Sequence, residues 1–209
     1  MLVLGHAGIT LGAAALLNGA LSKTRWQSKR VPEVTPGVLY TARDNPTSRL
    51  SSWFAALSSR LDVRFLLVGS LLPDIIDKPV GQLIFRETFN NGRIFCHTLL
   101  FLILITVPAL LLYRGRSRTW LLALSFGTFT HLILDQMWLN VKTLLWPLYG
   151  FTFARIDLTD WPQNVWLALL TEPEIYVPEI VGGAILVMLL WVLVRNRRLF
   201  SFIKNGRLS

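Results

Sequence analysis

The sequence has little cysteine and little charge. Cys96 is alone among 209 residues, which excludes an internal disulfide framework and any zinc motif built from several cysteines. Charged residues make up 16% of the chain, whereas a typical soluble domain has about 25%. The chain also has no internal repeat and no low-complexity tract, and 53% of its residues are hydrophobic. This composition excludes a disordered chain and an ordinary soluble enzyme, and it indicates a membrane protein.

The apolar residues are concentrated in five segments: 2–21, 65–77, 94–113, 119–139 and 177–194. Most of them approach the roughly 20 residues that a helix needs to cross a bilayer, and the second is shorter. The first segment has no basic stretch before it and no cleavage site of small residues, so we interpret it as a retained helix. The sequence therefore predicts an all-α protein, a polytopic bundle of about five transmembrane helices. We expect residues 1–209 to form a single membrane-embedded domain.

The basic residues are distributed unevenly between the connecting segments. Sixteen of the 21 Lys and Arg residues lie in 22–64, in 114–118 and after 194. The positive-inside rule therefore predicts an external N-terminus and a cytoplasmic C-terminus. Residues 22–64 become a basic cytoplasmic loop that contacts anionic lipids, and 140–176 become an external loop. Each loop has the aromatic residues of an interfacial helix. No known nucleic-acid-binding pattern is present, so we expect no nucleic-acid partner.

The chain has three histidines, and each lies inside an apolar segment. Ionisable groups are costly in the hydrocarbon region and usually mark a functional site. Aspartates accompany the histidines in the second and fourth segments. With the predicted topology, all of these groups reach one depth near the outer face. They are His6, Asp74, Asp77, His97, His131 and Asp135.

The spacing of these residues favours a metal site. His131 and Asp135 are four residues apart, and Asp74 and Asp77 are three apart, so each pair shares a helix face. Imidazole and carboxylate together suit Zn²⁺, Mn²⁺ or Fe²⁺, bound as one ion or two. Two other interpretations remain open from the residues alone. The same groups could form a proton relay in a transporter or ion-conducting protein, or they could be interhelical hydrogen bonds of a structural scaffold.

Four short motifs resemble the membrane-bound metal-dependent hydrolases, which are also called YdjM-like or LexA-binding inner-membrane-associated hydrolases. The resemblance covers about residues 1–150. Its motifs are Gly5-His6, Gly69-Ser-Leu-Leu-Pro-Asp74-Ile-Ile-Asp77-Lys78-Pro79, Gly92-Arg93-Ile-Phe-Cys-His97-Thr98, and His131-Leu-Ile-Leu-Asp135. That family is in turn similar to the zinc-dependent phospholipase C and P1-nuclease group, which carries histidines and aspartates around a zinc cluster.

The resemblance implies a protein of the prokaryotic inner membrane whose metal ligands are His6, Asp74 or Asp77, His97, His131 and Asp135. It also implies that Arg93 faces the substrate. Many family members read Leu-Pro-Asp-Ile-Asp-His and have a histidine before the arginine. This chain has an extra Ile between its aspartates, Lys78 after them, and Gly92 before Arg93.

The resemblance to the phospholipase C group implies phosphoester hydrolysis, and the depth of the predicted site, near the lipid headgroups, favours a lipid substrate. A lipid or a lipid-linked phosphate could enter from the outer leaflet. Whichever of Asp74 and Asp77 is not a ligand would act as general base. Arg93 would hold phosphate oxygens and Lys78 would add a point charge.

Overall fold

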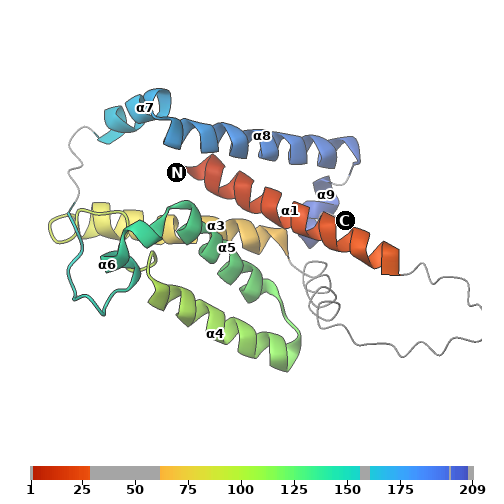
Figure 1. Ribbon diagram of the computed structural model, residues 1–209, viewed down its shortest axis with the longest axis horizontal. Coiled ribbons are helices and arrows are strands. Elements are labelled where there is room, and N and C mark those ends of the chain that lie inside the picture. The colour runs from red at the N-terminus through yellow and green to blue at the C-terminus, as the bar shows by residue number, and fades with distance from the viewer. Residues whose placement is uncertain (1, 29–61, 156–160, 198, 207–209) are drawn as a thin grey trace, which may run out of the picture. The chain divides into compact units, whose positions relative to one another are not determined.

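The computed structural model describes residues 2–28, 62–155, 161–197 and 199–206. Within these ranges the chain is helical and has no strand, which confirms the predicted all-α class (Figure 1). The chain divides into two compact units. One consists of Met1–Gly12 together with Leu61–Ser209, and the other is Ala13–Arg60. The interfacial helix predicted in the loop 22–64 would occupy its second half, residues 46–61, which lie outside the described residues. That residues 1–209 form one membrane-embedded domain stays a prediction.

Each predicted apolar segment contains a helix of the structure. In chain order these are α1 (Val3–Ser28), α3 (Val63–Lys78), α4 (Leu99–Arg116), α5 (Trp120–Leu134) and α8 (Pro173–Arg195). Shorter helices lie between or after them: the π-helix η1 (Pro79–Ile84), the 3-10 helix η2 (Met137–Leu139), α6 (Val141–Leu144), α7 (Trp161–Thr171) and, following α8, α9 (Leu199–Asn205).

Several boundaries differ from the expected ones. Helix α1 continues to Ser28, so the predicted loop 22–64 begins as helix. Helix α4 begins at Leu99 instead of 94, because the Thr98 hydroxyl accepts the N–H of Phe101 at 3.1 Å and caps the helix. Helix α5 ends at Leu134 instead of 139, because Gln136 is left-handed with φ 51°. The predicted external loop 140–176 contains α6 and α7, and α8 starts in it at Pro173.

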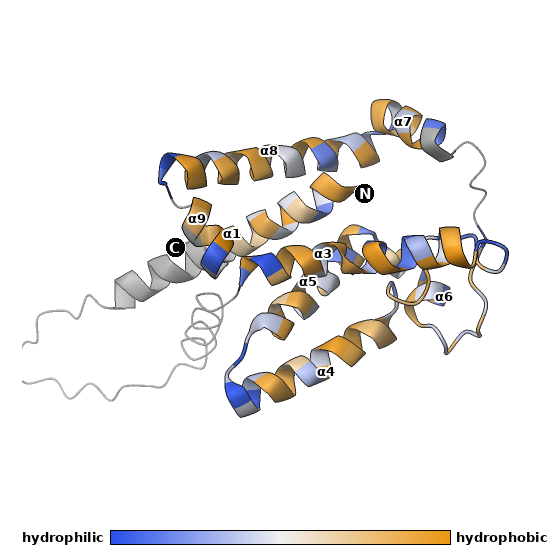
Figure 2. Ribbon diagram, turned by 180° about the vertical axis from the view of Figure 1, so that it is seen from behind, coloured by the Kyte–Doolittle hydropathy of each residue, from blue (hydrophilic) through white to orange (hydrophobic). Residues whose placement is uncertain are grey.

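Two described helices are long and apolar enough to cross a membrane, α4 and α8, while Val3–Leu16 and Trp120–Leu134 are shorter apolar helices. Figure 2 shows the hydrophobic residues along α4 and α8 and the hydrophilic ones at the C-terminal end of α4. The α4 side chains Leu104 and Leu111 are more than half exposed, as expected for a surface that faces lipid. Five crossings and the orientation of the termini stay predictions.

The packing of α3 against α5 forms the support of the site (Figure 1). The two backbones approach closely at Gly69 and Gly127, where an added Cβ would overlap the partner helix. Pro73 has no N–H for the carbonyl of Gly69, four residues earlier. The Thr128 hydroxyl of α5 lies 3.3 Å from that carbonyl oxygen and 3.1 Å from the carbonyl oxygen of Leu124, and it shares its one proton between the two. The proline in α3 thus produces a polar contact with α5 one turn below the predicted site.

Candidate metal centre

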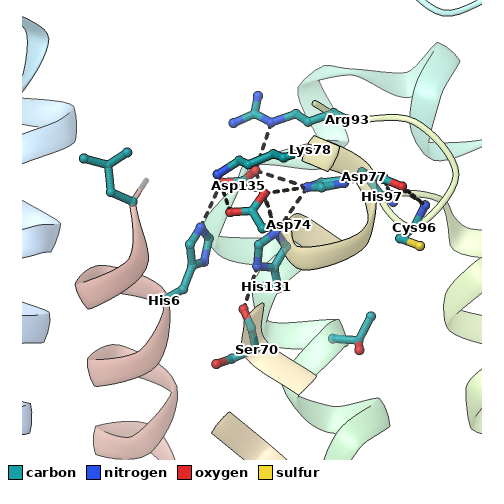
Figure 3. Close-up of polar contacts among 12 residues, drawn as sticks. His6, Ser70, Asp74, Asp77, Lys78, Arg93, Cys96, His97, His131 and Asp135 are labelled. Carbon is teal, nitrogen blue, oxygen red and sulfur yellow. Dashed lines mark hydrogen bonds and ion pairs between the residues drawn. The ribbon is translucent and has the colours of Figure 1, made fainter. Parts of the chain in front are cut away.

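Four segments that are distant in the sequence bring the predicted residues together (Figure 3). Helix α1 carries the first histidine near its N-terminus, and α3 carries the two aspartates at its C-terminus. The irregular segment before α4 carries the second histidine, and the last turn of α5 with its C-cap carries the third histidine and its aspartate. The side chains of His6, His97, His131 and Asp77 are completely buried. The residues singled out in the sequence therefore lie close together in space, while their depth in the membrane stays a prediction.

Four of these residues offer ligand atoms that lie within 4.8 Å of one another: Asp74, His97, His131 and Asp135. The Nε2 atoms of His97 and His131 are 3.2 Å apart. From His97 Nε2 it is 3.6 Å to Asp74 Oδ1 and 3.7 Å to Asp135 Oδ2. From His131 Nε2 the same oxygens are 4.0 Å and 3.9 Å away. Two nitrogens and two oxygens thus surround one point.

The hydrogen bonds of the two imidazoles determine which ring nitrogen faces this point. His131 Nδ1 lies 2.7 Å from the carbonyl oxygen of Ser70. A carbonyl oxygen only accepts, so Nδ1 carries the proton and Nε2 of the neutral ring presents its lone pair. His97 Nδ1 likewise lies 2.7 Å from Asp77 Oδ2 and donates to that carboxylate. Metal-binding histidines usually have such an acceptor on the second nitrogen.

This arrangement fits a divalent cation. With both Nδ1 atoms protonated, the two neutral imidazoles would direct lone pairs at each other over 3.2 Å unless a proton or a metal cation lies between them, and two carboxylates add negative charge to the same place. A cation between them turns these repulsions into attraction. For bonds of about 2.0–2.1 Å, tetrahedral ligand atoms are about 3.3 Å apart. The five separations that involve a histidine nitrogen are 3.2–4.0 Å, from slightly shorter than this value to moderately longer.

Asp77 lies outside the four-residue group although it shares a helix face with Asp74. Its carboxylate accepts the N–H groups of Ile94, Cys96 and His97 at 2.9, 3.0 and 3.2 Å, in addition to His97 Nδ1. These bonds draw the chain around Asp77 and keep residues 94–97 out of α4. Of the two aspartates, Asp74 contributes to the cluster, and Asp77 orients His97.

His6 is adjacent to the cluster but is not one of its four members. Its Nε2 lies 3.1 Å from Asp135 Oδ1, and its ring stacks on His131 with the centroids 4.1 Å apart. Asp135 therefore directs Oδ2 toward His97 and His131 and Oδ1 toward His6. The prediction that His6 is itself a metal ligand stays a prediction, and its observed partner is Asp135.

Two cations border the cluster on its more exposed edge. Lys78 Nζ is 2.7 Å from Asp74 Oδ2, and Arg93 Nε is 2.9 Å from Asp135 Oδ2. The side chains of Lys78 and Arg93 are 37% and 39% exposed, whereas the carboxylates that they contact are largely buried. Figure 3 shows both basic side chains on the same side of the aspartates. The more exposed edge of the cluster is thus rimmed by positive charge.

Residues 1–204 match the YdjM inner membrane protein family. The chain belongs to this family. It is therefore an inner membrane protein, as predicted, and the match extends the resemblance of residues 1–150 through α8 and α9. The description of the family names a location and no activity. Neither the curated proteins nor the solved structures contain a significant match.

In this member of the YdjM family, several groups at or near the site were missed by reasoning from the sequence. The Ser70 carbonyl and the N–H groups of 94–97 are backbone atoms, for which no residue type is a signal. Cys96 is buried, and its N–H donates to Asp77. Glu179 of α8 is also buried and accepts two N–H groups of α1. An acid inside the apolar segment 177–194 was a signal that could have found it.

Proposed function

We propose that this protein is a membrane-embedded, metal-dependent hydrolase that cleaves a phosphoester of a lipid or a lipid-linked substrate at the outer leaflet. The observation that carries the proposal is the group of two imidazole nitrogens and two carboxylate oxygens within 4.8 Å, with two partly exposed cations at its edge. Phosphoester hydrolysis by this route needs a bound metal cation and positive groups that neutralise the charge of the phosphate. The ligand atoms would serve the first requirement and the two basic side chains the second.

Zinc is the metal that this ligand set favours, with manganese and iron as the next candidates. Asp74, His97, His131 and Asp135 would hold one ion, each through one atom. Asp77 and the Ser70 carbonyl would fix the two rings, and His6 would fix Asp135. The family resemblance implies that His6 is a further ligand, so a second ion could be held if His6 joined the group. The bound ion would polarise a phosphoryl oxygen and lower the pKa of a water molecule to about 7.

The residues of the chain would perform the remaining steps. Arg93 is suited to phosphate oxygens, because its guanidinium can donate two parallel hydrogen bonds. Lys78 would add a second positive charge on the same edge. We assign the role of general base to the second oxygen of Asp74, Oδ2, which faces Lys78. The side chain of Asp74 is 11% exposed, whereas that of Asp77 is completely buried. Both oxygens of Asp77 are already engaged by N–H donors, so it has no atom left for a water molecule.

The uneven distribution of basic residues supports an outer-leaflet site. With about five crossings, an external N-terminus and a cytoplasmic C-terminus, His6 and the C-terminal ends of α3 and α5 would lie near the outer face. A phosphate in the headgroup region could then reach Arg93 and Lys78 without leaving the membrane. The basic segment 22–64 would contact anionic lipids at the cytoplasmic face.

The experiment that tests the proposal compares metal content and hydrolysis in the purified protein. We expect His131→Ala to lose the metal and the hydrolysis of both a chromogenic phosphodiester and phospholipid vesicles. Ile133→Ala is the matched control, because Ile133 is on the same helix and 42% exposed. It should retain both properties. A wild-type protein that contains no zinc, manganese or iron would contradict the proposal. So would ion flux along a gradient without hydrolysis, the result expected of a transporter.

A further inference from the structure

Glu179 is a buried acid in α8, a helix apolar enough to cross a membrane, and 7% of the residue is exposed. Its Oε1 accepts the N–H of Leu2 at 2.6 Å, and its Oε2 accepts the N–H of Leu4 at 3.0 Å. Those N–H groups lie at the start of α1, where they have no acceptor within the helix. An ionised carboxylate is costly to bury without such donors, and the dipole of α1 attracts it further. Glu179 therefore holds the N-terminus of α1.

A second contact between the two helices lies close by. Gly182 is three residues after Glu179, so the two share a face of α8. A Cβ added to Gly182 would overlap the Leu4 carbonyl oxygen, and one added to Gly8 would overlap Gly182. The helices are thus in backbone contact, and the position of α1 along its axis is determined at two points.

His6 lies between these two contact points. It is completely buried, with Nε2 3.1 Å from Asp135 Oδ1 and its ring stacked on His131. A hydrogen bond of this kind is lost when the separation increases by about half an ångström. A shift of α1 by that amount along α8 would therefore separate His6 from Asp135.

We infer that Glu179 is a positioning residue for the metal centre. Together with Gly182 it determines the position of α1 along its axis, and this position brings His6 into contact with Asp135 and His131. Helix α8 contributes no residue to the cluster, yet it determines the placement of the histidine that α1 carries. The effect on metal binding rests on the proposed function, whereas the effect on His6 does not.

Because the chain has only three histidines, the test is ¹⁵N NMR of the full-length protein with labelled histidine. The His6 signals are assigned with His6→Asn. We expect the ring signals of His6 to shift in Glu179→Gln, because an amide would oppose an N–H donor of α1 with its own donor. Gly182→Ala should shift the same signals by steric overlap.

Two matched controls should leave the His6 signals unchanged. Glu174→Gln is the same acid-to-amide change on an exposed residue of the first turn of α8. Gly183→Ala adds the same methyl group one residue further, where its nearest neighbour is Leu4 Cδ1 at 3.8 Å. Glu179→Asp keeps the charge on a shorter side chain. It should give an intermediate shift, which keeps the test decisive if a stronger variant does not fold.

Zinc affinity, measured by competition with a chelator, gives the second readout. Residues that support metal ligands typically affect affinity by 10–100-fold, and we expect Glu179→Gln to weaken zinc binding about tenfold. His6 signals identical to wild type in folded Glu179→Gln and Gly182→Ala would overturn the inference. A wild-type protein that binds none of zinc, manganese and iron would instead contradict the proposed function, and the NMR comparison would still decide the role of Glu179.

Discussion

Asp77→Asn is the substitution that separates a supporting role from a ligand role most directly. The carboxylate of Asp77 receives four donors, three backbone N–H groups and His97 Nδ1, at 2.7–3.2 Å. In the variant one oxygen becomes an NH₂ group, so at least one N–H donor faces another donor. The remaining bonds lose the charge of their acceptor.

The magnitude follows from these four bonds. A hydrogen bond to a charged group contributes about 1.5–3 kcal/mol and a neutral one about 0.5–1.5 kcal/mol. If most of the four bonds each weaken by about 1 kcal/mol, the free energy of unfolding falls by about 2–4 kcal/mol. Zinc binding should weaken by about 10–100-fold, since His97 keeps its position only partly. Asp74→Asn should instead lose most of the bound metal with a smaller effect on stability.

The assay combines unfolding in denaturant with zinc competition on the same preparations. Asp62→Asn is the matched control, because Asp62 caps the other end of α3, accepts the N–H of Arg64 at 3.0 Å, and is not part of the cluster. It should bind zinc as wild type does. If Asp77→Asn lost the metal completely while Asp74→Asn retained it, our assignment of the two aspartates would be wrong.

Other predictions concern packing, capping and topology. Gly127→Ala should destabilise the protein by about 1–3 kcal/mol, because the added methyl group overlaps the backbone of α3. Gly115 has open space around it, so Gly115→Ala should stabilise the protein by up to about 1 kcal/mol. Thermal unfolding of the two variants measures both effects. Thr98→Ala should cost about 0.5–2 kcal/mol through loss of the α4 cap and retain zinc in the competition assay. An impermeant thiol reagent should label Glu87→Cys but not Arg116→Cys on intact cells, and the reverse pattern would refute the external placement of the site.

The sequence by itself determined the all-α class, the apolar segments and the set of residues at the site. Three histidines in a hydrophobic chain are rare enough to be noticed individually. Residues four apart lie on one face of any α-helix, so the spacing of His131 and Asp135 was sufficient to place them together. Their side chains do face the same point, with His131 Nε2 3.9 Å from Asp135 Oδ2. Local geometry was sufficient for these predictions because it does not depend on the rest of the fold.

Only the tertiary structure distinguished the aspartate that joins the cluster from the aspartate that orients His97. Asp74 and Asp77 are one turn apart on the same face, so their spacing could not distinguish them. The difference arises because residues 94–97 return to the end of α3 and saturate Asp77 with N–H donors, which leaves Asp74 beside the imidazoles. The contact of His6 with Asp135 and the hold of Glu179 on α1 likewise join residues more than 120 positions apart. Such contacts depend on how helices pack, and no pattern within a single segment encodes them.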